Sequence, residues 1–377
     1  MTNFLTNVNS LIDPADEMYL HAVNCLKNAG LAMAGYFRQG AEINDTIQQL
    51  LSWRFGSNKN DVRFLDFACG YGRSTRFLVT QIPPDNVWVS DIYTDAVAFQ
   101  RRTFGVHGFD SCTDPAALKC DERFDMIFVS SLFTHLPAAR FEAWLRRLYE
   151  MLTPAGILAF SVHDEALAGS QRIPGSGVLF VEASESRTLS KNEYGSTYVT
   201  EEFVRSMIEA VAGPEWPYKR LVRALCGAHD VYVVSRDPQE SFTGLHYTHP
   251  PVGYVELFRI SEAGELRIGG WAGEPNEGVD LEAIQVKIDG RLIMSRKPDL
   301  ARDDVVKALG KEKYARSGWE CVHPIGDIDH SAEALIEVTA VSANGLSTML
   351  HLSPLSAGRE ESRRTWRSVL AGLLGRR

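Results

Sequence analysis

The segment FLDFACGYGRSTRFL, residues 64–78, constrains the fold of this chain more than any other part of it. Its apolar start predicts a strand that ends near Asp66, and its amphipathic end predicts a helix. Between them, the small residues Ala68, Gly70 and Gly72 predict a tight turn. Small residues at a strand–turn–helix junction let the backbone approach a ligand. The segment therefore predicts an α/β sheet with a nucleotide-type cofactor at this turn.

The spacing of the two glycines separates two classes of cofactor. A dinucleotide fingerprint has a third glycine three residues after the second, and that position is Thr75 here. The pattern instead resembles the first motif of class I S-adenosylmethionine (SAM) methyltransferases, which is an acidic residue, two small residues and Gly-x-Gly. It is filled by Asp66, Ala68, Gly70 and Gly72, with Cys69 where the family often has cysteine. Because SAM carries an ammonium and a sulfonium, an acidic residue at the turn suits it.

The composition sets broad limits on function. A chain of 377 residues is long enough for two or three domains. The net charge of -9 argues against broad nucleic-acid binding, so no nucleic-acid partner is expected. No apolar run approaches the roughly 20 residues of a membrane span, and the N-terminus lacks signal-peptide features. The six cysteines form no CxxC pair, so we expect a cytoplasmic protein without a disulfide framework or metal site.

Residues 61–237 alternate between strand and helix patterns. Apolar runs at residues 87–90, 124–131 and 156–162 predict strands, the second of them buried on both faces. Helix patterns separate these runs, so their order predicts a parallel, doubly wound sheet of Rossmann-like type. The run at residues 230–236 predicts a last strand, and the resemblance to methyltransferases implies that this strand is antiparallel.

The pattern changes after residue 237, and the chain divides into five predicted parts. They are an N-terminal helical extension or lid (1–60), the SAM-binding methyltransferase domain (61–237), a linker (238–251), an accessory β-sandwich (252–353) and a basic amphipathic tail (354–377). The predicted fold class is therefore α/β, with a doubly wound methyltransferase sheet followed by an antiparallel β-sandwich.

The second domain shows strand patterns joined by hairpin signals. Asp289-Gly290 and Asn344-Gly345 predict tight hairpins, and residues 303–309 predict one short helix. The stretches IGGWAGEP, VKIDGRLI, RKPDLARDDVVKALG and SGWECVHPI resemble a small β-domain that is attached to enzymes of bacterial surface-polysaccharide assembly. This resemblance implies a glycan acceptor, although it rests on association and not on a site.

The tail carries a charge opposite to that of the whole chain. From Pro354 to Arg377 it has six Arg and two Glu, a net charge of +4. Its apolar residues fall on one helical face, which predicts docking on an anionic membrane surface or a protein partner. The localisation expected is then cytoplasmic, with peripheral contact at the inner face of the membrane. Packing on the protein itself or on a second copy, or disorder, are the alternatives.

Ligands of doubly wound sheets lie beyond the carboxyl ends of the strands. Asp91 ends the second strand, 19 residues after Gly72, and a carboxylate there accepts hydrogen bonds from both ribose hydroxyls. Ile92 follows it and is included in the predicted cofactor site. The resemblance implies that a residue of the segment 111–116 contacts the adenine amino group, and Asp114 is the residue that we choose. A solvated Asp-Pro turn is the alternative at this position.

Further cofactor residues are implied by the same resemblance. Tyr36 and Gly40 resemble a Tyr-x-x-x-Gly pattern that precedes the first motif in many small-molecule methyltransferases. The tyrosine would then close over the methionine carboxylate. The sequence SSLFTHLP resembles the segment after the fourth strand, which lines the methyl-transfer channel. We therefore expect Ser130, Ser131 and Phe133 to contact the cofactor.

Two histidines and an aspartate are the candidate catalytic residues. His135 follows the fourth strand, and an imidazole can accept a proton near neutral pH. His163 and Asp164 come directly after the fifth strand, where such a pair could deprotonate a hydroxyl group. Packing or capping of a helix is the alternative role for His135.

These patterns together predict a SAM-dependent methyltransferase with SAM as its cofactor. We expect O-methylation of a small-molecule or sugar acceptor in bacterial surface-glycan biosynthesis. An NAD-dependent oxidoreductase is an alternative, which the missing third glycine disfavours. A catalytically inactive methyltransferase-like scaffold is another, disfavoured by the intact motif residues Asp66, Gly70, Gly72 and Asp91.

Overall fold

The computed structural model describes residues 8–27, 29–182, 189–325 and 334–359. Its contacts divide the chain into two compact units. Within the described ranges, the mixed-sheet unit holds residues 8–16 and 39–247, and the antiparallel unit holds residues 17–38 and 248–359. Beyond residue 359, the predicted basic tail lies outside the described residues.

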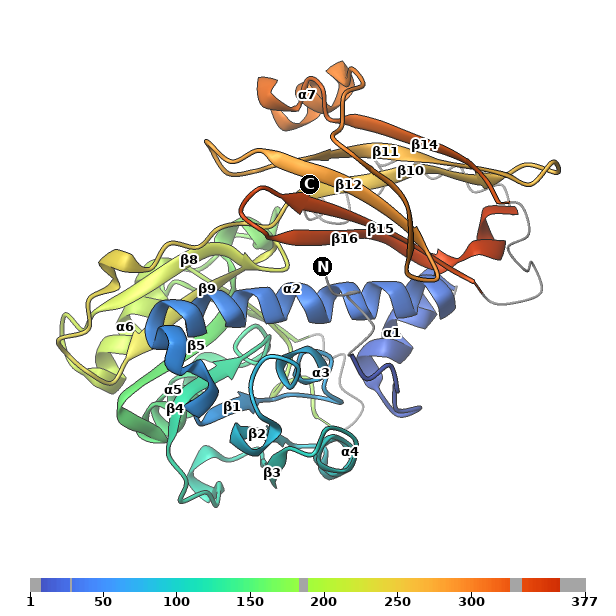
Figure 1. The fold of residues 1–377 in the computed structure, drawn as a ribbon. Coiled ribbons are helices and arrows are strands. Elements are labelled where there is room, and N and C mark those ends of the chain that lie inside the picture. Colours follow the sequence, from blue (N-terminus) through green and yellow to red (C-terminus); the bar gives the residue numbers. More distant parts are fainter. Residues whose placement is uncertain (1–7, 28, 183–188, 326–333, 360–377) are drawn as a thin grey trace. The chain divides into compact units, whose positions relative to one another are not determined.

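The mixed-sheet unit is built on parallel strands in the order β3-β2-β1-β4-β5 (Figure 1). Their bounds are β1 (Phe64–Phe67), β2 (Val87–Asp91), β3 (His107–Asp110), β4 (Phe124–Val129) and β5 (Leu152–Asp164). β9 (His229–Ser235) pairs antiparallel with β5, and β8 (Tyr218–Leu225) pairs antiparallel with β9. The strand order reverses between β1 and β4, which is where a doubly wound sheet binds its ligand. The predicted fold and the antiparallel last strand are confirmed.

A small extension continues the sheet beyond the carboxyl end of β5. β7 (Ser196–Val199) runs parallel to that end, with His163 opposite Tyr198 and Asp164 opposite Val199. β6 (Val178–Val181) pairs antiparallel with β7. The backbone of β7 therefore lies directly beside two residues that the sequence predicts to be catalytic.

Helices cover both faces of this sheet because its strands alternate their side chains between the two faces. They are α2 (Ala29–Phe55), α3 (Thr75–Leu78), α4 (Thr94–Phe104), α5 (Ala138–Glu150) and α6 (Glu201–Ala212). Phe64 of β1 belongs to the core formed with the mixed-sheet part of α2 and with α4. Its neighbour Leu65 belongs to the core formed with α5 and α6.

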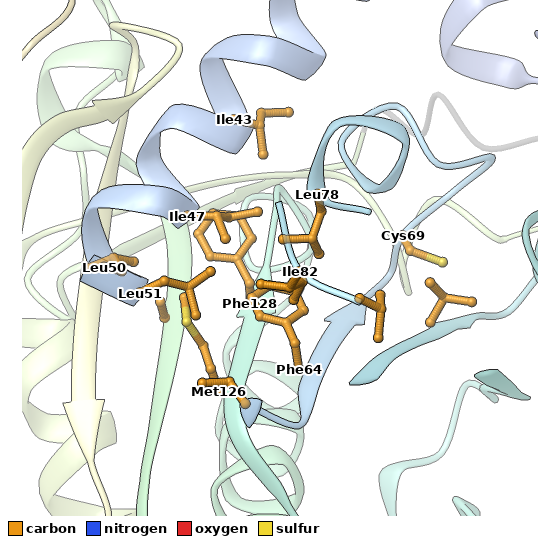
Figure 2. Packing of buried hydrophobic residues seen from close by; sticks show 14 of the residues in the cluster. Ile43, Ile47, Leu50, Leu51, Phe64, Cys69, Leu78, Ile82, Met126 and Phe128 are labelled. Carbon is orange, nitrogen blue, oxygen red and sulfur yellow. The ribbon is translucent and has the colours of Figure 1, made fainter. Parts of the chain in front are cut away.

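The mixed-sheet part of α2 packs on the sheet through a single apolar stripe (Figure 2). Ile43, Ile47, Leu50 and Leu51 recur at helical spacing, and all four are buried. They pack in one cluster with Phe64, Met126 and Phe128 of β1 and β4. Full burial of one large aliphatic side chain contributes about 1.5–3 kcal/mol, so this stripe fixes α2 firmly to the sheet.

The antiparallel unit contains two sheets, in the strand orders β10-β11-β14 and β13-β12-β15-β16. The strands are β10 (Val252–Ile260), β11 (Glu265–Gly273), β12 (Leu281–Ile288), β13 (Arg291–Arg296), β14 (Gly318–Pro324), β15 (Leu335–Ser342) and β16 (Ser347–Pro354). Residues of both sheets share one core that includes Ile268, Ile284, Trp319 and Val338. The unit also holds α1 (Glu17–Leu26) and α7 (Asp303–Leu309), and α7 is the short helix predicted from the sequence.

The predicted hairpin at Asp289-Gly290 is confirmed between β12 and β13. Both residues have positive φ angles, 46° and 77°, as a two-residue turn with the twist of its strands requires. Trp271 is buried and packs edge-on against Tyr314, with ring centroids 6.2 Å apart. No helix within the described ranges has the length and apolar character needed to cross a membrane.

Candidate cofactor and acceptor site

The glycine turn after β1 folds across the end of β2. The amides of Ala68 and Cys69 donate to the carbonyl of Ser90 at 2.8 and 3.2 Å. Ala68, Gly70 and Gly72 have φ angles of 58°, 52° and 77°. A left-handed conformation costs an alanine about 1–2 kcal/mol, and such strain is concentrated at functional sites. The turn is thus held in a conformation that the local sequence alone disfavours.

Gly70 and Gly72 are required in the turn for different physical reasons. A Cβ on Gly72 would lie 2.5 Å from Phe104 Cε2 and 2.8 Å from Gln100 Oε1, so this glycine lets α4 pack closely. A Cβ on Gly70 would meet no protein atom within 4 Å. Gly70 therefore borders open space, and it is the glycine beside which a ligand can approach the backbone.

Asp91 holds the turn against the end of β2. Its Oδ2 accepts a hydrogen bond from the Gly70 amide at 2.8 Å, and its Oδ1 accepts one from the Tyr93 amide at 3.0 Å. Each carboxylate oxygen has further lone pairs, so ribose hydroxyls can still donate to it. Ile92 follows in a half-buried position. The ribose-binding role remains a prediction.

Asp66 is buried at the end of β1 and connects this strand to α3. Its Oδ2 accepts hydrogen bonds from Ser74 Oγ at 2.9 Å and Thr75 Oγ1 at 3.0 Å. Burial, with the nearby charge of Asp91 acting in the same direction, raises the pKa of Asp66 to about 6. These bonds orient the carboxyl group toward the start of α3, so Asp66 supports the turn from behind.

Cys69 is a buried packing residue of the turn. Gln100 Nε2 donates to its sulfur at 3.0 Å and to the Gly70 carbonyl at 2.7 Å. Burial and the charge of Asp91 raise the pKa of the Cys69 thiol well above its usual range. The thiol is therefore protonated and is a poor nucleophile.

Arg76 connects the glycine turn to the N-terminal segment. Its side chain is fully buried, and its Nε donates to the Gly72 carbonyl at 3.0 Å. Its Nη1 donates to the carbonyls of Asn9 and Leu11 at 2.9 and 3.0 Å. One guanidinium group thus binds the backbone of both segments.

Gly40 brings α2 close to the turn, whereas Tyr36 belongs to the antiparallel unit. A Cβ on Gly40 would lie 2.1 Å from the carbonyl oxygen of Arg73, so only glycine permits this contact. Tyr36 packs edge-on against Tyr19 and Phe37, with ring centroids 6.0 and 5.9 Å apart. The cofactor contact expected for Tyr36 remains a prediction.

Asp114 lies on the surface near the other end of the expected site. Its Oδ1 accepts from the Ala116 amide at 3.3 Å and lies 3.5 Å from Arg140 Nη1. These contacts cap the short 3₁₀ helix Pro115–Ala117. The structure therefore shows a solvated Asp-Pro turn, and contact with adenine remains a prediction.

The segment after β4 contributes serines to the site and a phenylalanine to the core. Ser130 Oγ is buried without a hydrogen-bond partner, and Ser131 has a φ of 64° with its amide bound to Ser161 Oγ at 2.8 Å. Phe133 is fully buried, with ring centroids 4.6 Å from Phe141 and 4.8 Å from Phe160. Of these three residues, only the two serines lie where a ligand at the end of β4 could contact them.

The backbone orients His135. Its Nδ1 lies 2.7 Å from the Gly195 carbonyl oxygen, and its ring stacks on Tyr194 at 4.4 Å. A carbonyl oxygen can only accept, so Nδ1 carries the proton. In the neutral ring, Nε2 then holds the lone pair, which is the tautomer that a proton acceptor needs.

His163 lies beside a histidine that the sequence argument missed, His229. Their rings are perpendicular at 4.5 Å, and the His163 ring stacks on Tyr198 at 5.2 Å and lies 6.3 Å from His135. β9 pairs antiparallel with β5, so the residue before Asp230 falls opposite His163. Pairing the predicted last strand antiparallel with residues 156–162 would have placed His229 beside His163, so this register is the signal that could have identified it.

Both of these imidazoles are neutral at physiological pH. Burial, reinforced by His135, lowers the pKa of His163 to about 4. Burial, with His163, His135 and Arg73 acting in the same direction, lowers the pKa of His229 to about 3. The Nδ1 atoms of both rings are buried without a hydrogen-bond partner.

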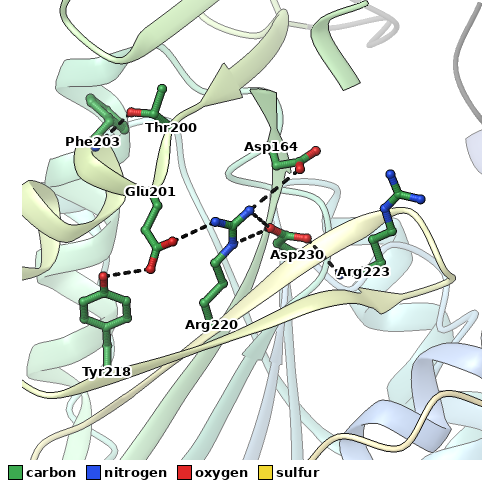
Figure 3. Close-up of polar contacts among 8 residues, drawn as sticks. All are labelled: Asp164, Thr200, Glu201, Phe203, Tyr218, Arg220, Arg223 and Asp230. Carbon is green, nitrogen blue, oxygen red and sulfur yellow. Dashed lines mark hydrogen bonds and ion pairs between the residues drawn. The ribbon is translucent and has the colours of Figure 1, made fainter. Parts of the chain in front are cut away.

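Asp164 faces an arginine and not its sequence neighbour His163 (Figure 3). Arg220 of β8 binds Asp230 at 2.6 Å and Glu201 at 2.7 Å, and it lies 3.8 Å from Asp164 Oδ2. Consecutive strand residues point to opposite faces, which separates the two side chains. Burial and the charge of Asp230 raise the pKa of Asp164. In the described contacts, the expected His163–Asp164 pair is not formed.

The part of the chain that the structure describes contains no group of three His, Cys, Asp or Glu side chains that could hold a metal ion. The polar groups at this edge of the sheet are instead two carboxylates near the glycine turn and neutral imidazoles near the end of β5. The carboxylates can bind a cationic ligand, and the neutral imidazoles can hydrogen-bond a neutral one.

Comparisons with known proteins agree with this geometry. Residues 65–158 match the family model described as "Methyltransferase domain". A malonyl-[acyl-carrier protein] O-methyltransferase from Calditerrivibrio nitroreducens is 25% identical over 164 residues, which are 42% of this chain. The aligned part spans 63% of the length of that relative.

Three solved structures show similar but distant folds. A SAM-dependent methyltransferase from Clostridium acetobutylicum is 14% identical, with 52% of this chain and 91% of that chain covered and a TM-score of 0.36. The amino pentose methyltransferase CalS10 from Micromonospora echinaspora is 16% identical, with 53% and 91% covered and a TM-score of 0.37. A 1,6-didemethyltoxoflavin-N1-methyltransferase from Burkholderia thailandensis is 16% identical, with 61% and 94% covered and a TM-score of 0.38.

Residues 65–158 thus match a methyltransferase domain. The family match and the strand order agree with the prediction made from the glycine turn, in which SAM is the cofactor. The dinucleotide alternative finds no support in the match.

The raised pKa of Asp66 predicts a pH dependence of stability. A carboxyl group with a folded pKa of about 6 and an unfolded value of 3.8 stabilises the fold when protonated. That contribution is complete below about pH 4 and is lost as pH rises through 6, a change of about 3 kcal/mol. We expect Asp66→Asn to remove this slope, so that the variant gains stability relative to the wild type between pH 4 and pH 8.

Denaturant unfolding of both proteins at the two pH values measures this effect. Asp85→Asn is the matched control, because Asp85 is exposed on the surface of the same unit. Identical pH slopes for the wild type and Asp66→Asn would show that the Asp66 carboxyl does not titrate with folding.

Proposed function

We propose that this protein transfers the methyl group of SAM to a hydroxyl oxygen of a small-molecule or sugar acceptor. The observation that carries the proposal is the His135 imidazole, whose Nδ1 is bound by the Gly195 carbonyl at 2.7 Å. That bond leaves the lone pair on Nε2, at the edge of the sheet where a methyltransferase domain holds its acceptor. The family match supports the reaction type, and the name of the relative, an O-methyltransferase, favours oxygen.

The residues at the glycine turn fit SAM. Gly70 borders space that a Cβ would otherwise fill, and Ser130 Oγ is a buried hydroxyl with no protein partner. Asp91 offers a carboxylate for ribose hydroxyls, and the negative charges of Asp66 and Asp91 near the turn favour a cationic ligand. When bound, SAM supplies a methyl group that its sulfonium charge has already activated.

The work that remains for the protein is to position the acceptor and take its proton. Positioning alone lowers the barrier of a displacement reaction substantially. A hydroxyl group must also lose its proton, and Nε2 of His135 is the group that we assign to accept it. Tyr194, stacked on the ring at 4.4 Å, keeps the imidazole in this orientation.

The glycan part of the proposal rests on the antiparallel unit. Its sequence resembles a β-domain attached to enzymes of bacterial surface-polysaccharide assembly, and its hairpin and short helix fold as that pattern predicts. We propose that this unit brings the enzyme to a glycan or a glycan precursor. It supports a sugar acceptor, in agreement with the neutral, aromatic surroundings of His135 and His163.

The cofactor assignment predicts the effect of removing the Asp91 carboxylate. Asp91→Ala loses the hydrogen bonds to ribose and the support of the Gly70 amide. Loss of such charge-assisted bonds weakens binding by roughly 10–100-fold. We expect this loss for SAM and S-adenosylhomocysteine in isothermal titration calorimetry, with no binding of NAD.

Asp95→Ala is the matched control, because Asp95 is exposed on the helix that follows Asp91. Tight SAM binding by Asp91→Ala, equal to that of the control, would contradict the ribose assignment. Absence of SAM binding by the wild type would contradict the proposed function itself.

The catalytic assignment predicts a different effect for His135. His135→Asn keeps a donor for the Gly195 carbonyl but has no nitrogen that can accept a proton. We expect a roughly 100-fold fall in kcat toward hydroxyl acceptors with unchanged SAM affinity, since general base catalysis contributes about 100–10,000-fold. The measurement is transfer of radiolabelled methyl groups to a panel of methyl glycosides.

His246→Asn serves as the control, because His246 is exposed in the same unit. Equal loss of kcat in both variants, or full activity of His135→Asn, would rule out the base assignment. Activity toward amine acceptors that His135→Asn retains would indicate nitrogen as the methylated atom, because a neutral amine needs no base during attack.

The basic tail makes a prediction about localisation. We propose a cytoplasmic enzyme in which residues 354–377, with a net charge of +4, contact the anionic inner face of the membrane. Deletion of residues 360–377 is expected to abolish sedimentation with phosphatidylserine vesicles and to leave SAM affinity unchanged. Vesicle binding that survives the deletion would exclude the tail as the membrane contact.

A further inference from the structure

We propose that His229 forms an acceptor subsite for a neutral polyhydroxyl compound, in which its Nε2 hydrogen-bonds a hydroxyl group next to the one that is methylated. This inference rests on the proposed function and names the substrate class of the same site. It assigns a role to a residue that neither the sequence motifs nor the family match identifies.

The fold places His229 at the acceptor side of the site. β9 runs antiparallel to β5, and Val162 pairs with Asp230 at the last step of their ladder. The next residues outward are His163 and His229, and their rings are perpendicular with centroids 4.5 Å apart. His229 therefore lies at the carboxyl edge of β5, where a doubly wound sheet binds ligands.

The hydrogen bonding of His229 is unusual for a half-buried polar side chain. Its Nδ1 is buried with no partner, and no residue in the described ranges hydrogen-bonds to its ring. Leaving a buried polar group unsatisfied lowers stability, so native proteins seldom do so without a reason. Nε2, which is not among the enclosed unpartnered atoms, is the ring nitrogen that a ligand can reach.

The charge state of the ring limits the class of ligand. Burial, His163, His135 and Arg73 together keep His229 neutral. A neutral imidazole has one N–H donor and one lone pair, and a hydroxyl group both donates and accepts. Nε2 is the donor in one tautomer and the acceptor in the other, so a hydroxyl group can bind either tautomer, whereas a carboxylate or an ammonium can bind only one.

The neighbouring side chains favour a neutral ligand as well. Arg220 cannot offer its charge to an acidic acceptor, because Asp230 binds it at 2.6 Å and Glu201 at 2.7 Å. Tyr194 and Tyr198 stack on His135 and His163, so aromatic rings line this edge of the sheet. Aromatic faces beside hydrogen-bonding groups suit a molecule that has C–H faces and several hydroxyls.

A binding experiment on the protein alone tests the subsite without requiring methyl transfer. Protein labelled with ¹⁵N-histidine is titrated with methyl α-D-glucopyranoside and methyl α-L-rhamnopyranoside, and the ring nitrogens are followed by long-range ¹H–¹⁵N spectra. The His229 signals are assigned by their loss in His229→Phe, which keeps an aromatic ring beside His163. We expect either glycoside to shift the His229 Nε2 signal, and methyl α-D-glucuronide to shift it less.

A kinetic experiment tests the role of the contact. With the glycoside that accepts a methyl group, we expect a mono-deoxy analogue that lacks the neighbouring hydroxyl to lower wild-type kcat/KM roughly 10–100-fold. For His229→Phe, we expect kcat/KM on the parent glycoside to fall by the same factor and to be the same for the parent glycoside and its deoxy analogue. Its SAM affinity should be unchanged. His229→Gln, whose amide reaches close to the Nε2 position, should recover most of the activity.

The outcomes separate this inference from the proposed function. A His229 shift without methyl transfer supports the subsite and counts against the methyltransferase activity. Methyl transfer without a His229 shift, or a His229→Phe variant that discriminates like the wild type, overturns the subsite and leaves the proposed function standing. A shift caused only by the glucuronide overturns the assignment to neutral acceptors.

Discussion

The hydrogen bond from the Gly70 amide to Asp91 Oδ2, 2.8 Å long, is the contact on which the candidate site depends. It joins the turn after β1 to the end of β2, and so fixes the loop on which SAM would lie. The left-handed residues Ala68, Gly70 and Gly72 are kept in place by this bond and by the Ser90 carbonyl. Because the carboxylate that holds the turn is also the proposed ribose ligand, the same side chain would shape the loop and bind the cofactor.

The two sides of the site differ in their electrostatics. Near the glycine turn, the charge of Asp91 opposes ionisation of Asp66, which a bound cation would relieve. Beyond the end of β5, the imidazoles of His163 and His229 are kept neutral by burial. A positive ring there would oppose the sulfonium of SAM, so neutrality on the acceptor side suits a cationic methyl donor.

Sequence reasoning was most successful where a local pattern alone decides the structure. The glycine turn, the buried strand β4, the short helix α7 and the Asp289-Gly290 hairpin all follow from spacing and turn chemistry. It missed β3, β6, β7 and β8. These strands are short or carry many polar side chains, and they form because a neighbouring strand offers its edge. Their pairing is a long-range property that no local pattern records.

The candidate site was likewise predictable only where a local sequence pattern decides the position of a residue. Gly70, Asp91 and the serines after β4 lie at or just after the ends of β1, β2 and β4, as the strand patterns predict. Phe133 lies in the core, because a large apolar ring next to Phe141 and Phe160 gains more from burial than from facing a ligand. The position of His229 depends on the pairing of β9 with β5, and the surroundings of His163 and Asp164 depend on the pairing of β5 with β7 and β9. The sequence next to each residue does not record these pairings.

The buried guanidinium of Arg76 has a consequence for how the protein tolerates change at its beginning. Its Nη1 is satisfied by the carbonyls of Asn9 and Leu11, while its Nε holds the Gly72 carbonyl. A polypeptide that started after residue 11 would lose both carbonyls that bind Nη1 inside the protein, directly behind the glycine turn. Asn9 and Leu11, which belong to neither a helix nor a strand, therefore help to stabilise the glycine turn.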